Sequence, residues 1–198
     1  MTPLILASAS PTRARLLSAA GVTFEIAPAA VDEEAFKSNW LRKEYVATDM
    51  ALGLAEEKAK SAGTAWPGKI MLGCDQLLVL GGELISKCAT QYDALVLLRR
   101  LRARAHELFT AAVLTLDGEM IWHHADCCRL TMRDFSDAFL SEYVSRSADA
   151  MTRSVGCYEL EGPGIQLFDR VDGDFFSILG LPLLPLLEEL RRLGILKR

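Results

Sequence analysis

The chain has 198 residues, of which 51% are hydrophobic and 24% are charged, and its formal net charge at pH 7 is −4. This hydrophobic content suffices for one sizeable core and excludes a largely disordered chain. The negative net charge disfavours a broad surface that binds nucleic acid, although it is compatible with a local anion-binding pocket.

The cysteines and the longest apolar run indicate a cytoplasmic protein without a membrane segment. Five cysteines occur, and no two have the C-x-x-C spacing of a zinc or redox motif, so we expect reduced thiols. No basic stretch precedes the first apolar run, so no signal peptide is expected. The longest apolar run, ILGLPLLPLL at 178–187, is too short to span a bilayer and contains two prolines.

The first third of the chain predicts alternating strands and helices. Leu4–Ala7 is a short apolar run typical of a buried strand, and Pro11–Ala20 has the spacing of an amphipathic helix. The segment VTFEIA at 22–27 alternates like a strand. Residues 28–36 are expected to form a polar loop, and a long helix is expected from about Lys43 to Ala62.

Two hairpins are predicted in the middle of the chain. Residues 69–87 form one around a Gly81-Gly82 turn, and residues 107–133 form the other around an Asp117-Gly118 turn. The alternation of helices and strands predicts an α/β fold around a mixed sheet, in one domain over residues 1–198. Further helices are expected at 90–103, 136–147 and 183–193, and loop and strand at 156–182.

Two serines and an arginine stand where the first predicted strand passes into the first helix. A helix N-terminus presents unpaired N–H groups and the positive end of the helix dipole. Ser10 is a plausible N-cap and Pro11 a plausible first helical residue. Together with Ser8 and Arg13, this junction suits an oxyanion such as phosphate. The alternative is that Ser10 only caps the helix and Arg13 is a surface charge.

Asp75 is the most informative acidic residue, because it lies within an apolar strand. A partly buried carboxylate is costly unless a cation, a metal or hydrogen-bond donors compensate it. The alternative is a carboxylate that binds backbone amides at a strand end. The other candidates are Glu33 in an acidic loop, Lys58 on the long helix and Lys87 beyond the returning strand. Taken alone, each lysine would be expected to be solvated.

The stretch HHADCC at 123–128 offers residue types that bind metals. On a strand, His124, Asp126 and Cys128 face one way, and the other two candidates face the opposite way. At most three ligands therefore share a face, and a zinc site is not the expected reading.

Six segments spread over nearly the whole chain carry a family resemblance: LILASASPTRARLL at 4–17, VDE at 31–33, EKAK at 57–60, GCDQLLVLGGELISK at 73–87, GCYELEGPG at 156–164 and VDGDFFSILGLPLLPL at 171–186. In this order they resemble the Maf family of nucleoside triphosphate pyrophosphatases, thought to act as house-cleaning enzymes. The resemblance implies an inosine-triphosphatase-like mixed α/β fold with a cleft between two lobes. It implies metal-dependent hydrolysis of a nucleoside triphosphate to the monophosphate and pyrophosphate, and it suggests a homodimer.

The resemblance also implies roles for individual residues. The two serines and the arginine of the first junction would bind the triphosphate, and the two lysines would add positive charge. The two carboxylates would hold Mg²⁺ or Mn²⁺. Asp75 would also position or deprotonate the attacking water. Matched by position, the site residues are Ser8, Ser10, Arg13, Glu33, Lys58, Asp75 and Lys87.

Three positions associated with base choice depart from the broader family pattern. Many members have Arg or Trp where Thr12 stands, Thr where Gln76 stands, and Gln where Glu161 stands. Gln76 and Glu161 resemble the branch that prefers 7-methyl-GTP, whereas Thr12 matches neither branch. The alternatives are a dTTP/UTP pyrophosphatase, a nucleotide-binding regulator of septum formation without turnover, and, more distantly, a phosphatase of small phosphoesters.

Overall fold

The computed structural model describes residues 4–41, 46–147, 151 and 153–197. Its internal contacts divide the chain into two compact units. Unit 1 contains Met1–Gln76, Thr110–Asp126 and Asp174–Arg198, and unit 2 contains Leu77–Phe109 and Cys127–Gly173. That the chain is one domain over residues 1–198 stays a prediction.

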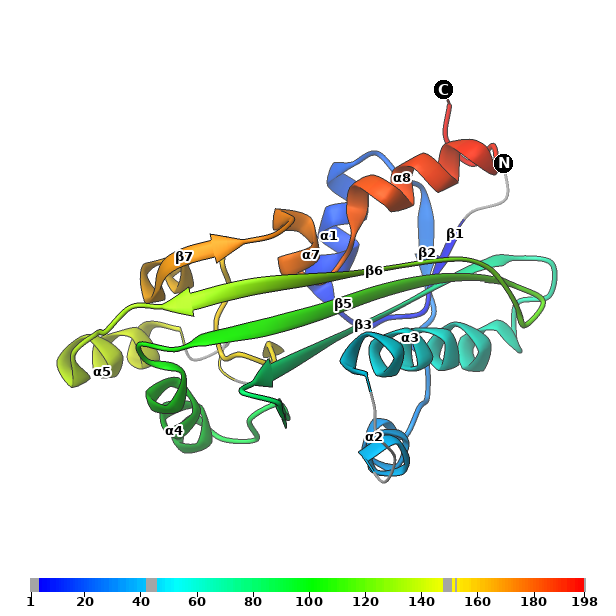
Figure 1. Cartoon of the computed structure of the whole chain (residues 1–198). Coiled ribbons are helices and arrows are strands. Elements are labelled where there is room, and N and C mark those ends of the chain that lie inside the picture. Colours follow the sequence, from blue (N-terminus) through cyan, green and yellow to red (C-terminus); the bar gives the residue numbers. More distant parts are fainter. Residues whose placement is uncertain (1–3, 42–45, 148–150, 152, 198) are drawn as a thin grey trace. The chain divides into compact units, whose positions relative to one another are not determined.

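Seven strands form one mixed sheet in the order β2-β1-β3-β5-β6-β7, and β4 pairs with β3 off this path (Figure 1). Strand β1 pairs in parallel with β2 and with β3, whereas the β3–β4 and β6–β7 pairs are antiparallel. The predicted mixed sheet with flanking helices is therefore confirmed. The strands are β1 (Leu4–Leu6), β2 (Phe24–Ile26), β3 (Ile70–Leu80), β4 (Glu83–Ile85), β5 (Ala105–Leu116), β6 (Glu119–Met132) and β7 (Phe168–Asp172).

The expected helices are confirmed with small differences at their ends. The long helix expected from Lys43 begins at Ala47 in the structure, and residues 43–45 lie outside the described residues. The helices are α1 (Pro11–Ala19), α2 (Glu33–Leu41), α3 (Ala47–Gly63), α4 (Gln91–Leu101), α5 (Asp137–Arg146), α7 (Phe175–Ile178) and α8 (Leu183–Arg192), together with the 3-10 helix η1 (Pro163–Leu167).

Both predicted hairpin turns are confirmed by their backbone angles. Gly81 and Gly82 have φ angles of 59° and 87°, and Asp117 and Gly118 have φ angles of 50° and 85°. Two consecutive residues with positive φ are the mark of the tight turn that matches the twist of paired strands. Glycine, and to a lesser degree aspartate, adopts this conformation at low cost.

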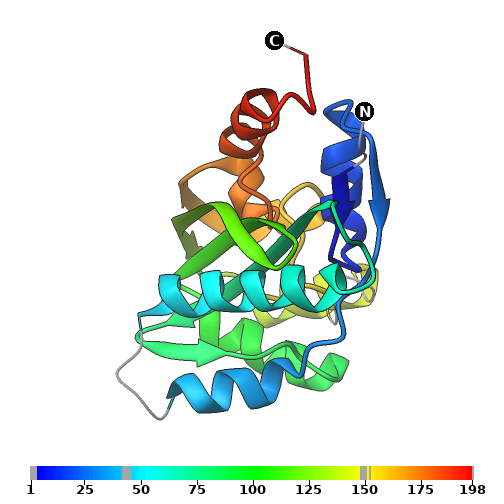
Figure 2. The same ribbon diagram turned by 90° about the vertical axis from the view of Figure 1, so that its right-hand side faces the viewer.

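Strand β3 separates two packed layers of unit 1. Leu72 and Cys74 belong to a core with side chains of α1 and α8, including Leu17 and Leu186. Met71 instead packs with residues of α3. Figures 1 and 2 show α3 on one side of β3, with α1 and α8 on the other. Because successive side chains of a strand point to opposite faces, odd-numbered residues of this part of β3 face α3 and even-numbered ones face α1 and α8.

The expected loop at 28–36 is wrong over its last residues, because α2 begins at Glu33. The side chain of Asp32 caps this helix by accepting a hydrogen bond from the backbone N–H of Ala35 at 2.9 Å. Phe36 and Trp40 stack one helical turn apart, with ring centroids separated by 6.0 Å. The cluster of acidic residues is thus a helix start, where negative charge is favourable.

The expected loop and strand at 156–182 also contain the short helices η1 and α7. Asp174 caps α7 through its side chain, which accepts a hydrogen bond from the N–H of Ser177 at 2.8 Å. Gly162 is the N-cap of η1, Gly164 lies within this helix, and Gly180 follows α7.

Unit 2 contains a buried histidine among aromatic rings. His106 is 1% exposed, and its Nε2 lies 2.7 Å from the hydroxyl oxygen of Tyr158. Tyr158 in turn meets the edge of Phe168, with ring centroids 4.8 Å apart. Burial lowers the pKa of His106 to about 4, so this imidazole is neutral at physiological pH.

Candidate active site

Arg13 is held at the start of α1 by three protein oxygens. Its Nη1 donates to Ser8 Oγ at 3.1 Å and to the carbonyl oxygen of Cys74 at 3.0 Å. Its Nε donates to the carbonyl oxygen of Gly180 at 2.8 Å. The hydrogen bonds of Arg13 to described residues use Nη1 and Nε, and none of them uses Nη2. Arg13 is therefore an oriented, partly buried guanidinium rather than a loose surface charge.

The two serines surround the same helix start. Ser10 caps α1, with its Oγ accepting a hydrogen bond from the N–H of Arg13 at 3.4 Å, as predicted. Ser8 is 8% exposed, and its Oγ accepts from the backbone N–H of Ser10 at 3.2 Å as well as from the guanidinium. A hydroxyl that accepts twice still has its own proton to donate. These donors converge on a helix N-terminus, which favours an oxyanion.

Lys58 joins two carboxylates from different elements. Its Nζ lies 2.5 Å from Oδ1 of Asp75 on β3 and 2.7 Å from Oε1 of Glu33 on α2. The lysine and aspartate side chains are only 12% and 6% exposed, whereas Glu33 is 37% exposed. The cationic partner that a buried Asp75 requires is thus Lys58 of α3, and three predicted site residues meet in unit 1.

A close approach of strand and helix places Asp75 beside Lys58. A Cβ atom on Gly73 would lie 1.9 Å from the backbone oxygen of Ala55, so only glycine fits where β3 crosses α3. Asp75 lies two residues further along the strand and faces the same side. Lys58 lies about one turn further along the helix than Ala55. The backbone contact therefore sets the distance across which the ion pair forms.

The remaining oxygen of Asp75 fits a divalent cation. Oδ2 is buried and has no hydrogen-bond partner within the described part of the chain. A buried anionic oxygen without a donor is costly, and Mg²⁺ and Mn²⁺ bind such oxygens. No group of three or more potential metal ligands occurs among the described residues. Asp75 and Glu33 are the carboxylates of this cluster that could hold such a cation.

Cys74 contributes its backbone rather than its thiol. The residue is fully buried, and burial raises the pKa of the thiol to about 11. The thiol is therefore protonated at physiological pH and is a poor nucleophile. Its carbonyl oxygen, by contrast, is one of the three that hold Arg13.

Sequence reasoning missed Gly180, whose carbonyl oxygen holds Arg13 from the far end of the chain. Gly180 has a φ angle of +99°, and a Cβ atom there would lie 3.6 Å from Nε of Arg13. The available signal was a glycine in the turn ILGLP after a short apolar segment. That signal indicated a turn, but it could not indicate which side chain the turn would meet.

The other predicted site residues are placed as follows. Thr12 lies in the first turn of α1, and Gln76 follows Asp75 on β3. Lys87 follows β4 and Glu161 precedes η1, both in unit 2. Their participation in the site of unit 1 stays a prediction, as does the cleft between two lobes.

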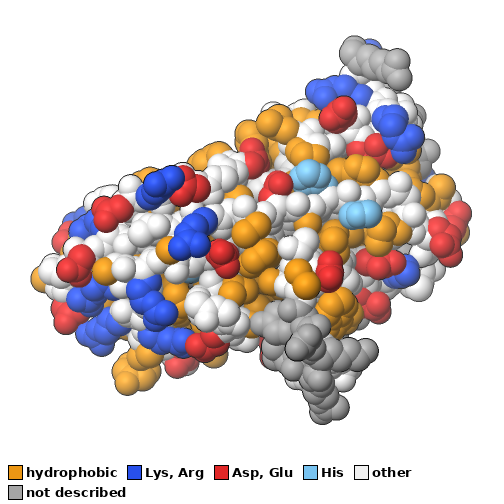
Figure 3. Space-filling view, viewed as in Figure 1, with side chains coloured by type: hydrophobic (Ala, Val, Ile, Leu, Met, Phe, Trp, Pro, Cys, Tyr) orange, Lys and Arg blue, Asp and Glu red, His pale blue; other side chains and the backbone are white. Residues whose placement is uncertain are grey.

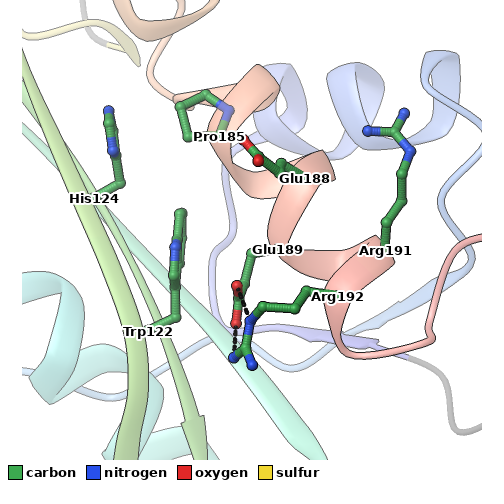
Figure 4. Close-up of a pocket in the computed structure, with 7 residues that line it drawn as sticks. All are labelled: Trp122, His124, Pro185, Glu188, Glu189, Arg191 and Arg192. Atoms are coloured by element: carbon green, nitrogen blue, oxygen red, sulfur yellow. Dashed lines mark hydrogen bonds and ion pairs between the residues drawn. The ribbon is translucent and has the colours of Figure 1, made fainter. Parts of the chain in front are cut away.

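The stretch HHADCC lies on β6, where His124 Nε2 is 3.1 Å from Asp126 Oδ1. A pocket of about 650 Å³ lies beside it, between β6 and α8 (Figure 4). Trp122 and His124 stack nearly parallel on its strand side, and Glu189 forms an ion pair with Arg192 on its helix side. The described lining contains none of the predicted site residues.

The face shown in Figure 3 carries acidic and basic side chains interspersed. On this face the basic side chains do not form one broad patch. No helix among the described residues is long and apolar enough to span a membrane.

Known proteins resemble this chain over almost its full length. A family model described as Maf-like protein matches residues 3–193. A Roseobacter denitrificans protein named nucleoside triphosphate pyrophosphatase is 47% identical over 99% of this chain and 98% of its own length. A Brucella abortus protein named 7-methyl-GTP pyrophosphatase is 44% identical over 96% of this chain and 95% of its own. A Caulobacter vibrioides protein named nucleoside triphosphate pyrophosphatase is 45% identical over 99% and 98%.

Proposed function

Because the chain belongs to the family of Maf-like proteins, we propose that it hydrolyses a nucleoside triphosphate to the monophosphate and pyrophosphate. One observation carries the proposal: Lys58 bridges Asp75 and Glu33 next to an unsatisfied buried carboxylate oxygen. The same compact unit holds an oriented guanidinium at a helix start. Cationic groups beside carboxylates suit a triphosphate, because its negative charge must be neutralised before water can attack phosphorus.

The anion-binding groups act on the phosphate oxygens. Nη2 of Arg13, the hydroxyl of Ser8 and the N-terminus of α1 donate to them, and Lys87 is proposed to add a further ammonium. Arg13 needs no reorientation when the substrate arrives, because three protein oxygens already fix it. Donors that are oriented beforehand stabilise the charge that develops in the transition state without a reorganisation cost.

The carboxylates act on the metal and on water. Asp75 and Glu33 would hold Mg²⁺ or Mn²⁺, which when bound neutralises phosphate oxygens and lowers the pKa of water. Lys58 holds Asp75 through Oδ1, and Oδ2 has no hydrogen-bond partner among the described residues. Asp75 orients the attacking water and accepts its proton as the water oxygen bonds to the α-phosphorus. The bond from that phosphorus to the bridging oxygen breaks, and pyrophosphate leaves.

We propose 7-methyl-GTP, or a similarly modified purine triphosphate, as the preferred substrate. The relatives named 7-methyl-GTP pyrophosphatase, each 44% identical, support this choice. In the proposal, the carboxylate of Glu161 accepts hydrogen bonds from both N1–H and the N2 amino group of guanine. Methylation at N7 makes the ring cationic and strengthens both donors. Uracil and thymine place acceptors on either side of a single donor and would be repelled. Thr12 is proposed to contribute to the same choice.

The test is hydrolysis of a panel of triphosphates, with the products identified. The panel contains ordinary purine and pyrimidine triphosphates and 7-methyl-GTP, each assayed with Mg²⁺, with Mn²⁺ and with a chelator. We expect monophosphate and pyrophosphate, loss of activity with chelator, and the highest kcat/KM for 7-methyl-GTP. Preference for dTTP or UTP would overturn the base assignment. Binding without turnover, or release of orthophosphate, would overturn the proposed reaction.

A further inference from the structure

Gln76 lies next to Asp75 in sequence but on the other face of β3. Asp75 faces α3, where it meets Lys58, so Gln76 faces the layer that contains α7. Its Nε2 donates to the carbonyl oxygens of Ser177 at 3.1 Å and Ile178 at 3.0 Å. The side chain thereby binds β3 to the backbone of α7.

Thr110 fixes which way the amide of Gln76 is turned. The hydroxyl of Thr110 donates its single proton to the carbonyl oxygen of Ser177 at 2.8 Å. Thr110 Oγ1 can therefore only accept a hydrogen bond from Gln76, whose Nε2 lies 2.9 Å away. Three protein acceptors thus surround the amide nitrogen, and its two protons have no free direction. Among the described contacts, Oε1 is the atom of this amide that the protein does not use.

Ser177 is held from a second direction by a carboxylate. It is fully buried, and its hydroxyl donates to Oδ2 of Asp126 at 2.5 Å. A hydrogen bond from a hydroxyl to an ionised carboxylate is short and strong. The backbone of α7 at Ser177 therefore lies between β3, β5 and β6, with a defined position.

The same segment holds Arg13 two residues later. Gly180 follows α7, and its carbonyl oxygen accepts from Nε of Arg13 at 2.8 Å. A Cβ atom on Gly180 would lie 3.7 Å from Nη2 of Arg13 and 3.9 Å from Oε1 of Gln76, so these groups meet at this turn. The position of the Gly180 carbonyl depends on where α7 is bound, and Gln76 provides two of the bonds that bind it.

We propose that Gln76 is a positioning residue for Arg13, acting through α7 and the carbonyl of Gly180. The proposal rests on the proposed function in taking Arg13 as the phosphate-binding group. In a variant without the Gln76 amide, the Ile178 carbonyl loses its partner and the turn at Gly180 shifts. Arg13 keeps its hydrogen bonds to Ser8 and Cys74, but the bond from its Nε to the Gly180 carbonyl no longer fixes the orientation of the guanidinium. The loss is then the same for every nucleobase, because it arises at the phosphates.

The test is Gln76→Met, which keeps the length of the side chain and removes the donor. Gln91→Met, at an exposed position of α4, is the matched control and is expected to behave as wild type. We expect a loss of about tenfold or more in kcat/KM, equal for a purine and a pyrimidine triphosphate, since small displacements of positioned groups reduce rates on this scale. When Arg13 is already replaced by alanine, Gln76→Met should lower kcat/KM by less than about twofold, because the two residues act as one unit.

A second readout does not depend on turnover. The Nε–H signal of Arg13, assigned through its absence in Arg13→Lys, is followed by NMR spectroscopy in wild type, Gln76→Met and Gln91→Met. We expect Gln76→Met alone to shift this signal and speed its exchange with solvent. If Gln76→Met does not fold, Ser177→Ala, which removes only the bond to Asp126, is expected to move the signal in the same direction.

An unchanged Nε–H signal, additive losses with Arg13→Ala, or a loss confined to one nucleobase would overturn the proposal. The last outcome would mean that Gln76 acts on the base, as the sequence comparison of branches predicts. Absence of hydrolysis in every protein, wild type included, would contradict the proposed function and leave the Arg13 signal as the deciding measurement.

Discussion

Replacing Asp75 by asparagine separates its charge from its shape. The amide is nearly isosteric, and its oxygen can still accept the hydrogen bond from Lys58 that Oδ1 accepts at 2.5 Å. Two properties disappear: the negative charge beside the partly buried ammonium of Lys58, and the buried Oδ2 that has no donor among the described residues. The amide nitrogen in its place brings two protons to a position that fits a cation.

The magnitude follows from these two losses. A positioned general base contributes about 10²–10⁴-fold, and the variant also loses a carboxylate for the metal. We therefore expect kcat for triphosphate hydrolysis to fall at least a hundredfold. Stability should change little, because Lys58 keeps Glu33 at 2.7 Å as an ionic partner. Steady-state kinetics and chemical unfolding of the same preparations provide the assay. A variant with wild-type kcat, or one that unfolds, would refute this account of Asp75.

Three further predictions concern other parts of the chain. Gly73→Ala should destabilise the fold by about 1–3 kcal/mol or more, measured by urea unfolding, because its Cβ would lie 1.9 Å from the Ala55 oxygen; a stable variant would contradict the close strand–helix approach. Because the pKa of His106 is about 4 in the folded state and about 6.5 when unfolded, the unfolded chain binds more protons between these values. The free energy of unfolding should fall by up to about 3 kcal/mol as pH drops through that window, and His106→Gln should flatten this dependence. The same pH dependence in His106→Gln would mean that the imidazole is solvated. Glu161→Gln should lower the ratio of kcat/KM for 7-methyl-GTP over UTP about tenfold or more, since a hydrogen bond to a charged group contributes about 1.5–3 kcal/mol; an unchanged ratio would remove Glu161 from base choice.

Local signals in the sequence predicted the elements that short-range chemistry determines. Ser10 caps α1 as expected, and Gly81-Gly82 forms the tight turn between β3 and β4. In each case the residue type and its neighbours decide the backbone angles. The start of α2 was missed because Asp32 stands among other acidic residues, and its role as a cap depended on the register of the helix that follows.

The site was predictable only in part. A buried carboxylate at Asp75 implied a nearby cation, metal or hydrogen-bond donor, and the structure supplies the cation Lys58 from a helix 17 residues earlier in the chain. The contact between Arg13 and Gly180 joins residues 167 positions apart, and no local pattern indicates it. Gln76 was assigned a role only through the family resemblance. Its hydrogen bonds to Ser177 and Ile178 were not predictable, because they follow from the packing of α7 on β3.

Hydrolysis in water labelled with oxygen-18 tests the central claim most directly. Attack on the α-phosphorus puts one labelled oxygen into the nucleoside monophosphate and leaves pyrophosphate unlabelled, which mass spectrometry of both products can measure. We predict this pattern for the wild-type protein, with the labelled monophosphate formed at least about a hundredfold more slowly by Asp75→Asn. Label in the pyrophosphate, release of orthophosphate, or no hydrolysis across the whole triphosphate panel would contradict the account.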